Sequence, residues 1–339
     1  MNMHIYYHTD QLPAFRRAVI TIGTFDGVHT GHAQILQQLR EEAARIGGET
    51  VIITFYPHPR KIVRGGTAEV RLLNTLEEKI RLLSWQGVDH LVVVPFTEAF
   101  SQMTAEEYIT DFLVEKFHPH TVIIGYDHRF GQGRLGDYHL LEEFSLKEGF
   151  ELQEIPVHLL DAVSVSSTRI REAIAQCDIG TATQLLGYSF FFSGVVMKGN
   201  QLGRTIGYPT ANLRVDNAEK QIPGDGVYAV EVAIVGDGAA DGADETPGVV
   251  AASGEIEVAG TPWAGALLKG MMNIGMRPTV DGRVRTIEVN IFDFNGDIYG
   301  RELRVFVRAY LRGEEKFNGL DALKAQLAKD REQAIAVLG

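Results

Sequence analysis

Short apolar runs alternate with helical stretches in the first half of the chain. The apolar runs are residues 19–23, 50–55, 91–95 and 121–125. The helical spacing of hydrophobic residues covers about 31–46, 76–86 and 105–116. The runs are hydrophobic at consecutive positions, as expected for strands that are covered on both faces. Strands that alternate with helices in this way predict a doubly wound α/β domain around a largely parallel sheet.

The pattern changes after about residue 184. From Phe190 onward, runs separated by glycines alternate hydrophobic and polar positions, and they cover 190–199, 226–235, 269–275, 285–294 and 301–311. This period of two predicts antiparallel strands that close a small β-barrel. A last helix is expected from Gly319 to about Val337. We therefore expect two domains, 1–184 and 185–339, which suits a chain of 339 residues.

Composition and charge narrow the function classes. The chain is 45% hydrophobic and 22% charged, which is ordinary for a globular protein. Its net charge of −12 argues against nucleic acid as a partner. No apolar run approaches the roughly 18 residues that span a bilayer, and the N-terminus lacks the features of a signal peptide. The single cysteine, Cys177, fits a reducing compartment. We expect a cytoplasmic protein, a monomer or weak homo-oligomer, without a membrane partner.

An acidic, glycine-rich segment joins two predicted strands of the barrel. Residues 231–268 hold seven acidic side chains and no Lys or Arg. Within this segment, 236–248 is rich in glycine and other small residues, which is typical of a loop. We expect a solvated extension of a hairpin without a function of its own.

The first predicted strand runs directly into the sequence TFDGVHTGH, residues 24–32. A turn between a strand and a helix presents backbone N–H groups and the positive end of the helix dipole to an anion. His29 and His32 are three residues apart and share one side of the first helical turn. Both imidazoles could therefore donate hydrogen bonds to phosphate oxygens. Phosphate binding is the favoured interpretation, and the alternatives are a structural or a metal-binding role for the histidines.

A second candidate for phosphate binding is SVSSTRIREAI, residues 164–174. Ser166, Ser167 and Thr168 supply hydroxyl groups for a helix N-terminus, and Arg169 and Arg171 follow in its first turn. Hydroxyls, free N–H groups and guanidinium groups together suit a phosphate. By itself, the same string is more often only a structural helix cap.

The second half has its own glycine-rich segment, GNQLGRTIGYPTANL, residues 199–213. Glycines let the backbone approach phosphates, and the Thr210 hydroxyl and Asn212 amide oxygen suit a hard cation such as Mg²⁺. A tight turn of the barrel is the alternative. Glu288 lies in a predicted strand that is otherwise apolar at alternate positions. It is either a general base or an outward-facing carboxylate in a salt bridge.

These segments resemble known motifs. TFDGVHTGH resembles the HxGH signature of nucleotidyltransferases, and SVSSTRIREAI resembles their second ATP-binding motif. TFYPHPRKIV (54–63) and GYDHRFGQGRLGD (125–137) resemble segments of the bacterial bifunctional riboflavin kinase/FMN adenylyltransferase family, also called FAD synthetase. Four further segments resemble parts of the riboflavin kinase domain of that family: PTAN (209–212), MNIGMRPTVDG (272–282), RTIEVNIFDF (285–294) and YLRGEEKFNGLDAL (310–323). The chain departs from the family at His128, where Phe or Tyr is usual, and in the long acidic segment within 236–262.

The resemblance covers nearly the whole chain and implies a Rossmann-like FMN adenylyltransferase domain followed by a riboflavin kinase barrel. The barrel would transfer the γ-phosphate of ATP to riboflavin, with Glu288 deprotonating the 5′-hydroxyl and with Thr210 and Asn212 holding Mg²⁺. The first domain would join FMN to a second ATP, giving FAD and pyrophosphate without a covalent intermediate. Its catalytic residues would be His29 and His32. The partners implied are the small molecules ATP, riboflavin and FMN.

The resemblance also implies three sets of binding residues. ATP in the first domain would contact Gly23, Phe25, Asp26, His29, His32, Ser167, Thr168 and Arg171. The flavin in that domain would contact Phe55, Pro57, His58, Asp127 and Arg129. ATP in the barrel would contact Gly199, Gly203, Gly207, Pro209, Thr210 and Asn212. Two alternatives stay open: a different adenylyl- or cytidylyltransferase with an appended barrel, and a non-catalytic flavin-binding or sensor protein.

Overall fold

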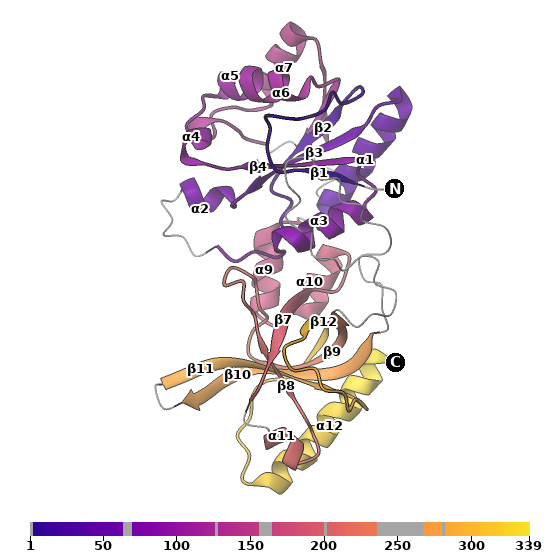
Figure 1. Cartoon of the computed structure of the whole chain (residues 1–339), viewed down its shortest axis with the longest axis vertical. Helices are drawn as coiled ribbons and strands as arrows, with labels where there is room; N and C mark the ends of the chain where they lie inside the picture. Colours follow the sequence, from indigo (N-terminus) through magenta and orange to yellow (C-terminus); the bar gives the residue numbers. More distant parts are fainter. Residues whose placement is uncertain are drawn as a thin grey trace. The chain divides into compact units, whose positions relative to one another are not determined.

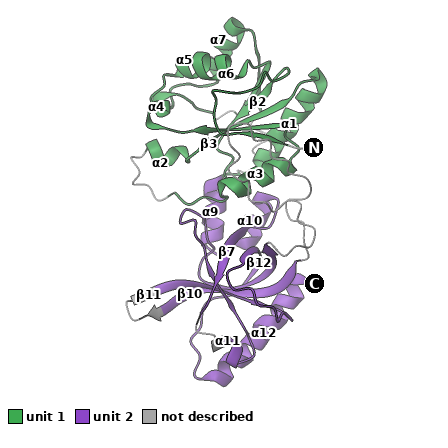
Figure 2. Ribbon diagram, viewed as in Figure 1, with its two compact units in different colours: residues 1–166, 245–262 green, residues 167–244, 263–339 purple. Residues whose placement is uncertain are grey.

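Two compact units make up the protein, which we describe from a computed structural model. The structure describes residues 3–63, 70–125, 128–155, 165–199, 202–235, 267–279 and 282–339. Among these, the first unit ends at Ser166 and the second begins at Ser167 (Figure 2). The predicted boundary between residues 184 and 185 stays a prediction, although the residues from Ser167 up to it belong to the second unit by their contacts. Asp127 and the acidic segment 236–262 lie outside the described residues.

The first unit contains a six-stranded parallel sheet (Figure 1). Its strands are β1 (His4–Tyr6), β2 (Val19–Ile22), β3 (Thr50–Tyr56), β4 (His90–Pro95), β5 (Thr121–Gly125) and β6 (Glu151–Ile155). They lie in the order β1-β4-β3-β2-β5-β6, and every pair of neighbours is parallel. The doubly wound α/β fold predicted from the apolar runs is confirmed. The carboxyl ends of β2, β3 and β5 lie at one edge of this sheet, where open α/β sheets bind ligands.

Helices cover the sheet because its central strands are apolar on both faces. They are α1 (Thr30–Ile46), α2 (Pro59–Val63), α3 (Leu76–Trp85), α4 (Glu98–Ser101), α5 (Ala105–Glu107), α6 (Glu115–Phe117) and α7 (Tyr138–Glu148). Ile20, Ile22 and Val51 pack in one cluster with residues of 105–117 and of α7. α1 packs on β2, β3 and β5 through its own buried leucines. Within the described residues, no helix is both long and apolar enough to cross a bilayer.

The predicted helix at 105–116 contains a π-helical segment, Tyr108–Val114, between α5 and α6. Tyr108, Phe112 and Leu113 of this segment are buried. The hydrophobic spacing alone does not distinguish this wider turn from an ordinary α-helix, because both bury one side of the segment.

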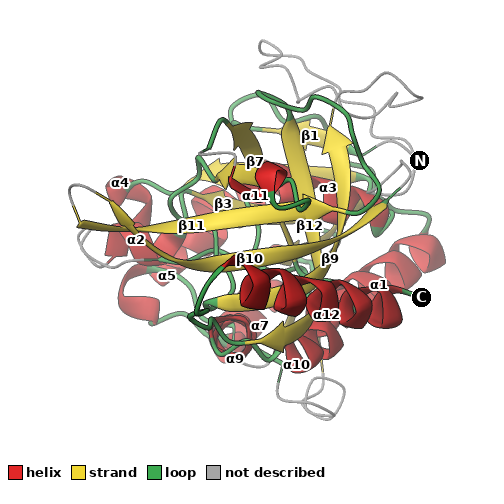
Figure 3. Ribbon diagram, turned by 90° about the horizontal axis from the view of Figure 1, so that it is seen from below, coloured by secondary structure: helices red, strands yellow, loops and turns green. Residues whose placement is uncertain are grey.

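The second unit is a closed antiparallel barrel, as the alternating runs predict. Its strands are β7 (Phe191–Met197), β8 (Ala211–Arg214), β9 (Gly226–Val235), β10 (Leu268–Thr279), β11 (Gly282–Ile291) and β12 (Glu302–Arg312). The order around the barrel is β10-β11-β8-β7-β12-β9, and β9 pairs with β10 to close it. The short helix α11 (Leu202–Thr205) precedes β8, and α12 (Leu320–Leu338) packs along β9, β10 and β12 (Figure 3).

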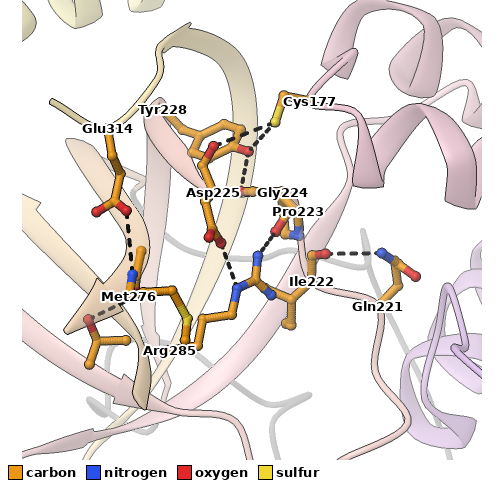
Figure 4. A network of polar contacts seen from close by, with 12 residues as sticks. Cys177, Gln221, Ile222, Pro223, Gly224, Asp225, Tyr228, Met276, Arg285 and Glu314 are labelled. Carbon is orange, nitrogen blue, oxygen red and sulfur yellow. Dashed lines mark hydrogen bonds and ion pairs between the residues drawn. The ribbon is translucent and has the colours of Figure 1, made fainter. Parts of the chain in front are cut away.

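Two further helices, α9 (Ser167–Ala175) and α10 (Ile179–Leu186), pack on each other, and the turn between them is tied to the start of β9. Figure 4 shows these contacts. The Tyr228 hydroxyl lies 3.2 Å from the Cys177 sulfur and donates to the Gly224 carbonyl at 2.6 Å. Arg285 of β11 pairs with Asp225 at 2.7 Å. A side chain at Gly224 would come within 2.6 Å of the Cys177 sulfur, so only glycine fits this approach.

Candidate active sites

The two histidines of TFDGVHTGH lie against each other at the start of α1. His29 is the residue immediately before the helix, and its Nδ1 accepts the backbone N–H of His32 at 3.3 Å. The two rings stack with their centroids 3.7 Å apart. A Cβ at Gly31 would lie only 3.3 Å from the His29 ring, so the glycine gives that ring its space. The sequence places His29 in the first helical turn, whereas the structure uses it as the helix cap.

Burial keeps both imidazoles uncharged near neutral pH. Desolvation lowers the pKa of His29 to about 4. Burial also places the pKa of His32 well below its ordinary value, and the charges of His29 and Lys79 lower it further. Since Nδ1 of His29 accepts a hydrogen bond, the proton of the neutral ring is on Nε2. His29 is therefore a neutral hydrogen-bond donor through Nε2.

The residues before the histidines shape the turn. Phe25 is buried at a φ of 47°, and its ring centroid lies 4.9 Å from that of His32. A Cβ at Gly23 would lie 3.2 Å from the Phe25 ring. Asp26 is buried, and its Oδ1 accepts the backbone N–H groups of Leu73 and Asn74 at 2.9 and 3.3 Å. The Asp26 carboxylate thus anchors the segment before α3 to the turn.

Ser167, Thr168 and Arg171 lie in the first part of α9, as the sequence predicts for a helix N-terminus. Ser167 and Arg171 are half-buried and Thr168 is exposed. α9 belongs to the second unit by its contacts, whereas His29 and His32 belong to the first. The joint action of these residues on one ATP stays a prediction.

Aromatic rings connect the two segments predicted to border a flavin. Phe55, at the end of β3, lies 5.6 Å from Phe100, and Phe100 lies 6.0 Å from Tyr108. Tyr108 stacks on Phe130 at 5.0 Å, and Phe130 lies 5.7 Å from His128. The structure therefore brings the segments 54–63 and 125–137 to one cluster of rings. His128 takes part in this cluster although its ring is not the usual Phe or Tyr.

The polar residues of these segments have local partners. His58 Nδ1 accepts the backbone N–H of Arg60 at 3.2 Å. Pro57 follows β3 after a cis peptide bond. The Arg129 guanidinium pairs with Asp137 at 3.0 Å, and Asp137 in turn caps α7. The role of these residues in flavin binding stays a prediction.

In the barrel, Glu288 and Asn212 lie directly opposite each other on β11 and β8. Residues opposite each other in an antiparallel pair project from the same face. Their neighbours Val289 and Ala211 are buried on the other face. Glu288 itself is only 8% exposed. The structure thus places the candidate base beside a candidate ligand of Mg²⁺.

Arg277 of β10 forms an ion pair with the Glu288 carboxylate. Burial raises the pKa of Glu288, and the positive charge of Arg277 opposes that shift. The sequence leaves open whether Glu288 is a base or a partner in a salt bridge, and the structure shows the salt bridge with Arg277. The two interpretations are compatible, since a carboxylate held ionised can accept a proton.

The glycine-rich segment approaches the side chains of Asn212 and Thr210 closely. A Cβ at Gly199 would overlap the Asn212 amide, and a Cβ at Gly203 would overlap the Tyr208 carbonyl and lie 3.3 Å from Thr210 Oγ1. Gly207 has a φ of +85°, which favours glycine. These glycines therefore serve close approach and turn geometry around the PTAN segment.

A cavity of about 500 Å³ opens beside the same segment. Its walls include Pro209, Thr210 and Ala211, together with two aromatic side chains, Phe294 and Tyr299. The other lining residues are Val196, Arg204, Gly207, Val289, Ile291, Asn295, Gly296, Asp297 and Ile298. Ala211 and Val289 face the cavity, whereas Asn212 and Glu288 alternate to the other face. β8 and β11 therefore separate the cavity from the Glu288 carboxylate by one layer of backbone.

Sequence reasoning missed two polar residues of this site. Arg277 was not distinguished from other charged residues of MNIGMRPTVDG, because its partner depends on the pairing of β10 with β11. Asn290 lies two residues after Glu288, and its Nδ2 donates to the Pro209 carbonyl at 2.7 Å. Asn290 alternates with apolar residues in the same way as Glu288, and this alternation was the available signal for Asn290.

Comparisons with known proteins agree with this division into two units. A family model for FAD synthetase matches residues 12–169, and one for riboflavin kinase matches residues 186–338. The bifunctional riboflavin kinase/FMN adenylyltransferase of Escherichia coli K12 is 38% identical over 322 residues, which are 95% of this chain and 93% of the relative. The enzyme of the same name from Listeria monocytogenes is 34% identical, over 98% of this chain and 97% of the relative.

A solved structure has the same fold along the whole chain. A crystal structure from Streptococcus pneumoniae, described as a macrolide-efflux protein, superposes with a TM-score of 0.80 at 27% identity. The superposition covers 98% of each chain. With the two family models and the relatives above, these findings show that the chain belongs to the bifunctional riboflavin kinase/FMN adenylyltransferase family.

Proposed function

We propose that the two reactions of this protein, phosphorylation of riboflavin to FMN and adenylylation of FMN to FAD, depend on two separate sets of residues. Riboflavin phosphorylation takes place in the barrel around Glu288. FMN adenylylation takes place at the β2–α1 turn around His29 and His32. The observation that carries this proposal is the placement of Glu288 opposite Asn212 in the barrel, next to a cavity that Thr210 lines.

In the barrel, Glu288 accepts the proton of the riboflavin 5′-hydroxyl as that oxygen attacks the γ-phosphate of ATP. A general base acts in its ionised form. Arg277 favours that form through the ion pair, against the effect of burial. The Asn290 side chain donates a hydrogen bond to the Pro209 carbonyl and so fixes the PTAN segment beside β11.

The cavity beside the PTAN segment takes the adenine base of ATP, and the phosphates extend past Thr210, just before β8, to the face that carries Asn212 and Glu288. Its aromatic walls, Phe294 and Tyr299, suit a base, and Arg204 adds positive charge. The predicted contacts from Gly199, Gly203, Gly207 and Pro209 surround Thr210 and Asn212, as the close approaches above support. Backbone that approaches a ligand this closely suits phosphate oxygens.

Thr210 and Asn212 fit the Mg²⁺ that accompanies ATP. Their hydroxyl and amide oxygens are hard donors, and the glycines beside them leave room for phosphate and water ligands. Mg²⁺ supplies charge neutralisation on the phosphates when it is bound. The protein's own part is to present the Asn212 oxygen on β8, the strand that pairs with β11, and the Thr210 hydroxyl just before that strand.

At the β2–α1 turn, the FMN phosphate attacks the α-phosphate of a second ATP and pyrophosphate leaves. The attacking group is already an anion, so no protein nucleophile is required. His29 donates a hydrogen bond from Nε2, and the N-terminus of α1 adds the positive end of its helix dipole. Gly23, Phe25, Asp26 and His32 shape the turn, and Ser167, Thr168 and Arg171 supply further phosphate donors.

The ring cluster that joins Phe55 to His128 supports flavin binding near the carboxyl ends of β3 and β5. Phe55, Tyr108 and Phe130 are buried in the core, so the cluster supports the site by holding the two segments together. Pro57, His58, Asp127 and Arg129 complete this predicted subsite.

A time course with riboflavin, ATP and Mg²⁺ tests the proposal, with the flavins resolved by chromatography. FMN is expected first and FAD after it. FMN without FAD would contradict the assignment of the first unit, and binding of flavin without either product would favour a sensor.

A further inference from the structure

A buried lysine, Lys79, lies next to the β2–α1 turn and has no part in the chemistry described so far. It is in the first turn of α3 and is 7% exposed. Its ammonium group donates to the Thr24 carbonyl at 2.7 Å. Thr54 of β3 donates to the same carbonyl at 3.3 Å. α3 and β3 therefore both hold the residue at which the TFDGVHTGH turn begins.

Lys79 is a cation without a described counter-ion. Among the ion pairs between described residues, none includes Lys79, and the hydrogen bond described for its ammonium group goes to a neutral carbonyl. An ammonium group has three donors and is costly to bury unless it is paired with an anion. Asp26 is near enough for its charge to favour the protonated form of Lys79, but its Oδ1 is occupied by two backbone N–H groups.

The histidines of the turn cannot supply this charge. His29 and His32 are both uncharged near neutral pH because they are buried. Lys79 is close enough to lower the pKa of His32 further. The first turn of α1 carries no acidic residue. In the first unit, Lys79 is thus a buried cation beside a turn whose histidines are neutral and whose carboxylate, Asp26, accepts backbone N–H groups.

We propose that Lys79 is a positioning residue of FMN adenylylation: it holds the Thr24 carbonyl, and its buried positive charge acts through the turn on the phosphates of ATP. This inference rests on the proposed role of the β2–α1 turn. The partner class is a nucleoside triphosphate, whose negative charge grows on the leaving pyrophosphate. A buried charge acts on such a group more strongly than an exposed one, since the surroundings screen it less.

The charge of Lys79 depends on pH. Burial lowers the pKa of Lys79 to about 8, and the charge of Asp26 opposes this shift. The charged and titratable groups that face it are Asp26 from the turn and His32 from α1, while Glu78 on its own helix caps α3 through Thr75. In the protein without ATP, Lys79 is therefore protonated below about pH 8 and neutral above it.

The test measures FAD formation from supplied FMN in the full chain, with riboflavin phosphorylation by the same chain as an internal control. Lys79→Met should lower kcat/KM for ATP in FAD formation by about 100-fold and leave FMN formation unchanged. Lys79→Arg keeps the charge and should recover most of the loss. Lys147→Met is the matched control, because Lys147 is exposed in the same unit over the Phe144 ring.

A pH profile separates charge from simple packing. In the natural protein, kcat/KM for ATP in FAD formation should fall as pH rises through about 8, and Lys79→Arg should remove that fall because a guanidinium stays protonated. The phosphate groups of the substrates do not titrate in this pH range, because the second pKa of a phosphate ester is about 6. The pH profiles of the natural protein and of Lys79→Arg test the proposal even if Lys79→Met fails to fold.

Each result decides the proposal. FAD formation at the natural rate in Lys79→Met would overturn it, and so would a fall near pH 8 that persists in Lys79→Arg. Loss in Lys79→Met with recovery in Lys79→Arg supports it. If His29→Ala also leaves FAD formation intact, the assignment of the turn has failed and not the role of Lys79 alone.

Discussion

The β2–α1 turn and the β8–β11 strand pair are built from different kinds of side chain. The turn has two stacked, buried imidazoles that are neutral near pH 7. The strand pair has a carboxylate in an ion pair with Arg277. This difference follows the substrates. An FMN phosphate is already a nucleophile and needs neutral or positive donors around it, whereas the hydroxyl of riboflavin must lose a proton to a base.

The two candidate sites also differ in how far apart their residues lie in the sequence. In the first unit, a single turn between β2 and α1 provides most of the residues predicted to contact ATP, so they are close in sequence. In the barrel, Asn212, Arg277 and Glu288 come from three strands and meet only through pairing. Motifs in the sequence are therefore more complete for the turn than for the barrel.

The strongest way to break the comparison is to remove the base. Glu288→Gln keeps the shape but cannot accept the proton, so FMN formation should fall by about 10²- to 10⁴-fold. FAD formation from supplied FMN should stay near the natural rate. Assays of both activities on one preparation check this, and a matching loss of FAD formation in folded protein would show that the two sites are not separate.

The reverse change removes the donor of the turn. His29→Ala should lower FAD formation by about 10²- to 10³-fold, as for the loss of a hydrogen bond to a developing charge. FMN formation should be unaffected. Because His29 also caps α1, a thermal unfolding curve serves as the control. Equal losses in the two activities would argue against the neutral-donor role.

A smaller effect is expected from closing the space beside Asn212. In Gly199→Ala the new methyl group would overlap the Asn212 amide, which should lower FMN formation by about 10- to 100-fold, with a weaker dependence of rate on Mg²⁺ concentration. Gly180→Ala in α10 is the control, since a Cβ there meets only Asp178 at 3.8 Å. Unchanged kinetics in Gly199→Ala would remove Asn212 from the predicted Mg²⁺ site.

The mildest test sharpens the role of Arg277. The guanidinium lowers the pKa of Glu288 against the effect of burial, so Arg277→Gln should raise that pKa. With a higher pKa, Glu288 would become protonated, and so lose its function as a base, at a higher pH than in the natural protein. FMN formation should drop several-fold near pH 6 and by only about twofold near pH 8. An acid limb that stays in place would mean that Arg277 does not hold the charge of Glu288.

Much of the fold could be predicted because the spacing of hydrophobic residues along the chain indicates the positions of its strands and helices. The central strands β2, β3, β4 and β5 and the helices α1, α3 and α12 were found within one or two residues, whereas α7 was not predicted. β6 was missed because ELQEI is mainly polar and lies at an edge of the sheet, where burial is not required. β1, with three residues, is too short to give a periodic signal.

The site was less predictable where it depends on tertiary contacts. His29, His32 and Glu288 were recognisable from their sequence context. Lys79 was not, because its burial against the Thr24 carbonyl depends on how α3 packs on the turn. The spacing of residues in the chain does not encode such a contact. The assignment of α9 to one unit or the other is equally a matter of packing.

The pairing of β11 with β8 and β10 limits where residues can be inserted into or deleted from the barrel. Glu288 faces Asn212, and both of its strand neighbours face the opposite side. A deletion or insertion of one residue in β11 before Glu288 would exchange the two sides, turning the carboxylate toward the cavity and a valine or isoleucine toward Asn212. The kinase half can therefore diverge by exchanging side chains along β11, while the number of residues in that strand is fixed.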